Sequence, residues 1–178
     1  MQILPIPAPM FIINVSSPRA AVIMRTPVLR DWHGLAFTEN KAEYARYLTE
    51  KYGDGSEIPF TETTAAEFIE NYTAALKDYR KANADVMMIP QKRDYSLSNE
   101  DENGFPNITE AQNYVYRYSG LDFERQQDMI VTEYWTVLAD AVKAEYSRTD
   151  KGREYLEDAY IDMEIAALRE KVRENGDE

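Results

Sequence analysis

The chain has 178 residues and no cysteine, which excludes disulfide bonds, thiolate metal sites and cysteine nucleophiles. Its 32 acidic residues outnumber its 20 basic residues and give a net charge of −12, so direct binding to a phosphate backbone is not expected. No apolar run approaches the roughly 20 residues that a membrane span requires. The N-terminus lacks the basic start of a signal peptide. These properties favour a cytoplasmic protein.

The excess of acidic residues grows along the chain. Residues 1–60 hold six acidic and six basic residues, residues 61–120 hold ten and six, and residues 121–178 hold sixteen and eight. The local net charges are therefore 0, −4 and −8. Such a surface repels nucleic acid and attracts basic proteins, although it can also serve solubility alone.

A chain of this length is most simply a single domain, residues 1–178. Within it we distinguish a proline-rich, β-forming N-terminal part (1–38), two helices with a short connection (39–90), an acidic loop (91–107) and a helical C-terminal half (108–175). We expect an α-dominated α+β fold. A small N-terminal β-hairpin or sheet would pack on four to five helices around a long central helix.

The N-terminal part contains two runs rich in strand-forming residues. Met10–Val15 and Ala20–Met24 flank the turn signal Ser16–Arg19, which predicts a β-hairpin. Val28–Phe37 is a candidate for a third short strand.

Two helices are expected next, each opened by a capping-box pattern. Asn40 and Glu43 precede an apolar stripe that ends at Gly53, and Thr64 and Glu67 precede a second stripe.

Two later segments have alternative interpretations. Asp85–Ile89 is short and apolar, as in a buried strand or a hydrophobic connection. Thr109 and Gln112 can cap a short helix closed by Gly120, although the alternating tyrosines of residues 114–118 also fit a strand. We favour the helix.

The C-terminal half is predicted to contain two long helices. Leu121–Tyr146 has the periodicity of one amphipathic helix, about 39 Å long, on which the core would be built. A last helix follows the turn Ser147–Gly152 and runs to about Asn175. It carries two apolar stripes on different sides: Leu156, Tyr160, Met163 and Ala167, and then Ile161, Ile165, Leu168 and Val172. Either the helix is sandwiched within the fold, or the second stripe mediates self-association in a structural or assembly subunit.

An acidic loop matches the spacing of an EF-hand calcium site. Asn99, Asp101, Asn103 and Glu110 occupy ligand positions 1, 3, 5 and 12, with Gly104 at the turn. The first ligand is a neutral amide where Asp is usual. The alternative is an Asn-Gly turn followed by a helix whose first turn contains Glu110. A calcium-binding module is thus one hypothesis, and no other cofactor is indicated.

The only histidine, His33, follows Asp31 by two residues, so it is a candidate general base oriented by that carboxylate. A structural histidine is more common. The motifs of the usual hydrolases and transferases are missing, and we therefore expect a protein that is not an enzyme.

The acidic residues of the last helix form the main binding hypothesis. Glu154, Asp158 and Asp162 recur every four residues and so share one side of the helix, with further acidic residues nearby. The expected partner-binding residues are these three together with Glu157 and Glu164 and the loop residues Glu100, Asp101 and Glu102.

From charge, size and missing motifs we expect an acidic protein-interaction protein with a basic protein partner. Its concrete form would be a nucleic-acid-mimicking inhibitor of a nucleic-acid-handling enzyme, of the anti-defence type encoded by mobile elements. The alternatives are the self-associating subunit and the calcium-binding module.

Overall fold

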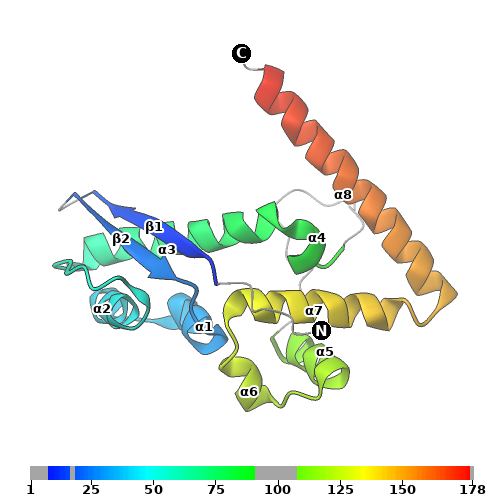
Figure 1. The fold of residues 1–178 in the computed structure, drawn as a ribbon, viewed down its shortest axis with the longest axis horizontal. Helices are drawn as coiled ribbons and strands as arrows, with labels where there is room; N and C mark the ends of the chain where they lie inside the picture. The colour runs from blue at the N-terminus through cyan, green and yellow to red at the C-terminus, as the bar shows by residue number, and fades with distance from the viewer. Residues whose placement is uncertain (1–7, 17–18, 91–107, 177–178) are drawn as a thin grey trace, which may run out of the picture. The chain divides into compact units, whose positions relative to one another are not determined.

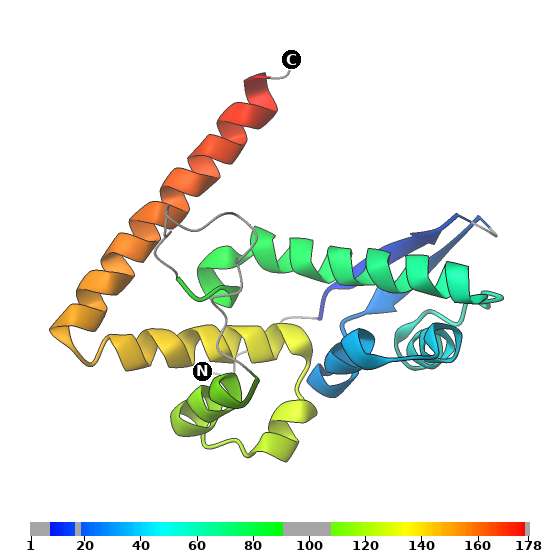
Figure 2. The same cartoon turned by 180° about the vertical axis from the view of Figure 1, so that it is seen from behind.

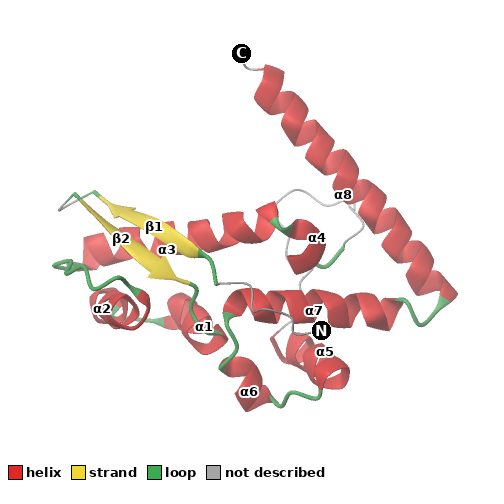
Figure 3. Cartoon of the chain, in the orientation of Figure 1, coloured by secondary structure: helices red, strands yellow, loops and turns green. Residues whose placement is uncertain are grey.

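The computed structural model describes residues 8–16, 19–90 and 108–176, which adopt an α-dominated α+β fold (Figures 1 and 3). Within these ranges the chain forms two strands and eight helices. In chain order they are β1 (Met10–Val15), β2 (Ala20–Arg25), α1 (Leu29–Phe37), α2 (Lys41–Tyr52), α3 (Glu62–Ala82), α4 (Ala84–Met87), α5 (Ile108–Ser119), α6 (Phe123–Gln127), α7 (Val131–Tyr146) and α8 (Asp150–Gly176).

The chain forms two compact units, which are described separately. The first unit comprises residues 1–85 and 123–135, and the second comprises residues 86–122 and 136–178. Helix α7 begins in the first unit and continues into the second.

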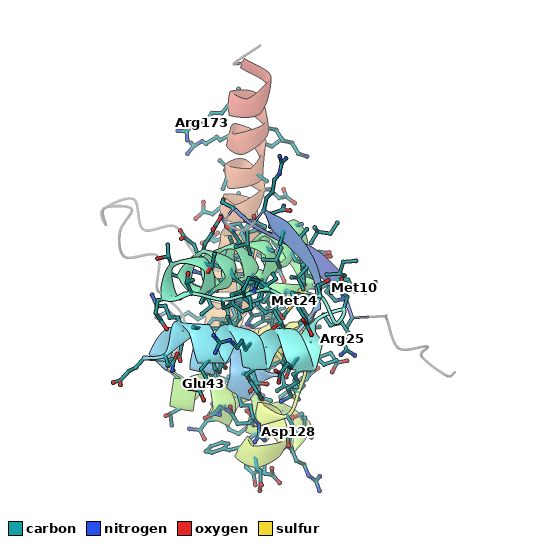
Figure 4. All side chains as sticks on the ribbon, turned by 90° about the vertical axis from the view of Figure 1, so that its left-hand side faces the viewer. Met10, Met24, Arg25, Glu43, Asp128 and Arg173 are labelled. Atoms are coloured by element: carbon teal, nitrogen blue, oxygen red, sulfur yellow. The ribbon has the colours of Figure 1, made fainter. Side chains whose placement is uncertain are left out.

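The predicted hairpin is confirmed in the first unit. Strands β1 and β2 pair in antiparallel register from Met10 opposite Arg25 to Val15 opposite Ala20. Alternate side chains point inward and are buried, as expected for a strand with one solvated face. They are Ile13, Val15, Val22 and Met24. Figure 4 shows Met24 among the interior side chains and Met10, which is 69% exposed, at the outer edge.

Helices α2 and α3 complete the core of this unit. Helix α3 packs against β1, and α2 packs against both α3 and β2. Phe68 and Tyr72 of α3 are fully buried, and the Tyr72 hydroxyl donates a hydrogen bond of 2.5 Å to the Arg25 carbonyl at the end of β2. The two expected helices are therefore confirmed, and both bury side chains of their apolar stripes in this unit.

The two helix starts differ from each other. Asn40 caps α2 as predicted, since its side-chain oxygen accepts a hydrogen bond of 3.0 Å from the Glu43 amide. The predicted capping box of α3 is wrong, because Thr61 and Thr64 cap that helix one turn earlier. The Glu67 carboxylate instead accepts a hydrogen bond of 3.0 Å from the Ser16 amide at the hairpin turn.

Two predictions, the third strand and the undivided central helix, are wrong for a shared reason: the chain near residue 130 is hydrogen-bonded to the segment before α1. The third strand is not formed, because residues after Val28 make helix α1 and only Val28 bridges to Ile130. The Leu29 amide donates to the Met129 carbonyl, and the Val131 amide donates to the Pro27 carbonyl, each at 2.9 Å. These bonds hold the chain extended at residue 130 and divide the predicted central helix into α6 and α7.

The second unit contains α5, the later part of α7, and α8 (Figure 2). Helix α5 confirms the helical interpretation of residues 109–120, and Asp85–Ile89 is mostly the short helix α4. The Tyr146 and Tyr155 rings meet edge to face at 5.3 Å across the turn between α7 and α8. A Cβ on Gly152 would lie 2.0 Å from the Tyr146 carbonyl oxygen, so this turn requires glycine.

The described residues form more helices than the expected four to five, because α1 and α4 were not predicted as helices and the predicted central helix is divided into α6 and α7. Among the described residues, no helix combines the length and apolar character needed to cross a membrane.

Candidate functional site

The predicted calcium loop lies mainly outside the described residues. Asn99, Asp101 and Asn103 fall there, as do the loop residues Glu100 and Glu102 of the predicted partner surface. The last candidate ligand, Glu110, is exposed in the first turn of α5. In residues 8–16, 19–90 and 108–176, no three acidic or histidine side chains are placed to hold a metal ion.

The first unit contains a buried carboxylate that accepts several hydrogen bonds, that of Asp31 in the first turn of α1. It is 6% exposed. It accepts hydrogen bonds from the Lys51 ammonium at 2.9 Å, the Tyr52 hydroxyl at 2.5 Å and the Tyr47 hydroxyl at 3.2 Å. The Tyr44 hydroxyl donates to the Asp31 backbone carbonyl at 2.6 Å. We call these five residues the Asp31 cluster.

The sequence of α2 explains how the cluster assembles. Tyr44, Tyr47 and Lys51 are three and four residues apart, which places them along one side of the helix. The Tyr44 and Tyr47 rings stack at 5.7 Å, and the Lys51 ammonium lies 5.1 Å from the Tyr47 ring centre. Gly34 of α1 leaves room for the Tyr44 hydroxyl, because a Cβ there would lie 2.2 Å from that oxygen.

The Asp31 cluster holds protons strongly. The hydrogen bonds that the Lys51 ammonium forms with Tyr47 and with the Asp31 carboxylate raise the pKa of Lys51 above its ordinary value. Burial and the negative charge of Asp31 raise the pKa of Tyr44 to about 12. Burial, followed by the hydrogen bond to Asp31, also raises the pKa of Tyr52. These three groups keep their protons at neutral pH, so the cluster is suited to holding α1 against α2 rather than to transferring protons.

The hypothesis of a His33 base oriented by Asp31 does not fit this geometry. Tyr47, Lys51 and Tyr52 of α2 donate to the Asp31 carboxylate, while His33 forms a side-chain hydrogen bond with Gln127 of α6. Burial lowers the pKa of His33, and the hydrogen bond to Gln127 partly offsets this shift. His33 thus connects α1 to α6.

The predicted acidic residues of α8 lie at the surface of the second unit. Glu154, Glu157 and Glu164 are exposed, and Asp158 and Asp162 are half-buried. All five fall in one continuous helix, so the row of Glu154, Asp158 and Asp162 exists as expected from the spacing. We call these three residues the acidic row.

The same helix exposes large aliphatic side chains. Ile161 is 55% exposed, Leu168 62% and Val172 71%, and Ile165 is 36% exposed. We call these four residues the apolar stripe. The other predicted stripe begins with Leu156, which is 7% exposed, whereas Tyr160 is 40% exposed. Beyond Ala159, no side chain that the structure describes on α8 is buried.

Sequence reasoning missed the Asp31 cluster. The one available signal was the spacing of Tyr47 and Lys51 beside the predicted stripe of α2. Nothing in that spacing identified Asp31, twenty residues earlier, as their common partner.

Comparisons of the chain with models of protein families, with characterised proteins and with solved structures found no match.

Proposed function

We propose that this chain is an acidic, non-enzymatic protein-interaction protein whose helix α8 binds a basic partner. The observation that carries the proposal is the exposure of Glu154, Glu157 and Glu164 on a helix that buries no described side chain beyond Ala159. A projecting helix with exposed carboxylates can approach a concave, positively charged surface without any change in its own core.

The division of charge between the units supports this assignment. The second unit holds 18 acidic and 10 basic residues, a net charge of −8, whereas the first holds 14 and 10, a net charge of −4. Complementary charge of this kind mainly accelerates encounter and selects the partner, and its effect weakens with salt. The binding we propose is therefore fast and sensitive to salt.

The concrete form of the proposal is a nucleic-acid mimic that inhibits a nucleic-acid-handling enzyme. Carboxylates four residues apart are about 6 Å apart along a helix, which is close to the spacing of phosphates along one nucleic-acid strand. An enzyme groove lined with Lys and Arg would accept such a row in place of its substrate.

The test uses the full chain as an immobilised bait in a cell lysate, followed by identification of the retained proteins. We expect a nucleic-acid-binding protein that is released by high salt and displaced by duplex DNA. Partners that resist both salt and DNA would contradict the proposal.

A pair of double variants identifies the surface. Glu154→Lys with Glu157→Lys changes the charge of α8 by +4 and should abolish retention. The matched control, Glu50→Lys with Glu57→Lys, makes the same change at exposed positions of the first unit and should retain the partner. Equal loss with both variants would show that only net charge matters.

A further inference from the structure

The apolar stripe of α8 has the spacing of a coiled-coil seam. Ile161, Ile165, Leu168 and Val172 are separated by four, three and four residues, as are alternating d and a positions of a heptad. Ile165 and Val172 then occupy a positions, and Ile161 and Leu168 occupy d positions. All four are large apolar residue types of the kind that fill such a seam.

The structure leaves this seam uncovered. All four side chains are between 36% and 71% exposed, and Figures 1 and 2 show the C-terminal part of α8 extending away from α7. Isolated helical segments are marginally stable in water and gain most of their stability from packing an apolar face. We therefore expect a second helix to pack against the seam of α8.

The charges beside the seam select its partner and its direction. We propose that α8 pairs with α8 of a second copy of this chain in antiparallel orientation. Ile161 then faces Val172 of the second copy, and Ile165 faces Leu168 of the second copy. This arrangement places Glu164 beside Lys171 of the second copy and Asp162 beside Arg169 of the second copy. By two-fold symmetry each of these pairs of opposite charge occurs twice.

A parallel pair has poorer complementarity. It also brings opposite charges together at Glu164 and Arg169, but it places Glu157 beside Asp162 of the second copy. It further stacks Asp158 on itself at an a position of the seam, where like charges repel. In the antiparallel pair Asp158 instead lies near the end of the second helix, and Glu154 lies beyond it.

The pair leaves Glu154, the outer end of each of the two acidic rows, beyond the end of the second helix. Their centres are 17 residues apart along the helix axis in the antiparallel arrangement, or about 26 Å at 1.5 Å per residue. The seam has only four apolar layers, so we expect a weak, reversible dimer that forms as concentration rises. The pairing engages Asp162 and Glu164, whereas the variant that tests the proposed function changes Glu154 and Glu157, so the two proposals are tested separately.

The first experiment is sedimentation of the full chain over a range of concentrations. We expect a monomer–dimer equilibrium that Leu168→Gln shifts at least tenfold towards monomer. Ala167→Gln is the matched control, because Ala167 is exposed on another side of the same helix, and it should leave the equilibrium unchanged. A chain that stays monomeric at all concentrations would overturn the proposal.

Charge exchange tests the direction of pairing. Glu164→Lys alone and Lys171→Glu alone should each weaken the dimer, and a mixture of the two variants should restore it as a heterodimer. Lys171 has no charged counterpart in the parallel arrangement, so an unchanged equilibrium for Lys171→Glu would overturn the antiparallel assignment.

Cross-linking gives an independent measure, since the natural chain has no cysteine. Chains with Ile161→Cys should form disulfides with chains carrying Val172→Cys. Neither variant should cross-link efficiently to itself, because the equivalent positions lie about 17 Å apart along the axis. Efficient self-cross-linking of Val172→Cys would indicate a parallel pair and contradict the inference. If the Glu154→Lys and Glu157→Lys variant loses the basic partner but still forms the dimer, the proposed function and the proposed dimer depend on separate surfaces.

Discussion

Acidic side chains occupy different environments in the two units. In the first unit the Asp31 carboxylate is buried and accepts three side-chain hydrogen bonds, and Glu67 accepts bonds from the Ser16 amide and hydroxyl. On α8 of the second unit, Glu154 and Glu157 are exposed. Net charge alone therefore does not identify a binding surface. What distinguishes the carboxylates is whether the fold supplies donors to them.

The Asp31 cluster should produce the largest effect. Asp31→Ala removes the common acceptor of Tyr47, Lys51 and Tyr52, and we expect the free energy of unfolding to fall by about 2–3 kcal/mol. This value is reduced because the Lys51 side chain is 41% exposed and partly screened by solvent.

Tryptophan fluorescence measures this change selectively. Both tryptophans of the chain, Trp32 and Trp135, lie in the first unit with their rings 5.5 Å apart. Glu50→Ala on the exposed side of α2 is the control and should change stability by less than about 0.5 kcal/mol. Equal effects of the two substitutions would break the contrast between buried and exposed carboxylates.

The second unit should depend more on close packing than on buried carboxylates. Gly152→Ala places a methyl group against the Tyr146 carbonyl, and we expect a loss of about 1–3 kcal/mol from the resulting overpacking. Thermal unfolding followed by circular dichroism would detect it. Lys151→Ala, at the neighbouring exposed position, is the control. Identical melting of the two variants would show that the turn tolerates a side chain.

Alkaline pH should weaken the first unit. The pKa of Tyr44 is raised to about 12 in the folded protein, so the unfolded chain loses this proton first, from about pH 10. Stability linked to Tyr44 is therefore complete below pH 10 and is lost as pH rises towards 12. The raised pKa of Lys51 acts in the same direction. Burial likewise raises the pKa of Tyr72 and Tyr134.

Urea unfolding followed by tryptophan fluorescence at pH 9 and pH 11 checks this expectation. The midpoint should fall at the higher pH, and Tyr44→Phe should reduce the fall. If the urea midpoint of Tyr44→Phe falls between pH 9 and pH 11 as much as that of the natural chain, the Tyr44 hydroxyl does not contribute to the pH dependence of stability.

A smaller effect is expected at acid pH. Burial lowers the pKa of His33, so the unfolded chain binds this proton more readily. Stability linked to His33 is present above about pH 6.5 and is lost as pH falls through the folded pKa. The substitution His33→Gln should reduce the difference in urea midpoint between pH 7.5 and pH 5.5. The same slope in both proteins would contradict this assignment.

The smallest effect on stability should come from α8. Glu154→Gln with Glu157→Gln removes two exposed charges, and we expect the free energy of unfolding to change by less than about 0.5 kcal/mol. A loss comparable to that of Asp31→Ala would show that these carboxylates belong to the fold, and it would remove the contrast between the units.

Local patterns allowed much of the fold to be predicted. The hairpin follows from two β-rich runs around a turn, α2 follows from its capping signal and periodicity, and α5 and α8 follow from periodicity. The division between α6 and α7 could not be predicted. It depends on two backbone hydrogen bonds between residues about one hundred positions apart, from the Val131 amide to the Pro27 carbonyl and from the Leu29 amide to the Met129 carbonyl, and periodicity contains no information about them.

The candidate surfaces show the same limit. The acidic row and the apolar stripe were predictable because helical spacing alone places their members together. The Asp31 cluster was not, because it joins two helices and depends on Gly34 admitting the Tyr44 hydroxyl. Local periodicity thus identifies what one helix presents, whereas a cluster shared by two helices requires their packing.

The most direct test of this account is a salt gradient applied to partner protein bound on three immobilised chains. These are the natural chain, the Glu154→Lys and Glu157→Lys variant, and the Glu50→Lys and Glu57→Lys control. We expect elution at the same salt concentration from the natural chain and the control, and no binding to the α8 variant. Elution of the partner at the same salt concentration from all three chains would contradict the claim that the carboxylates of α8 serve recognition.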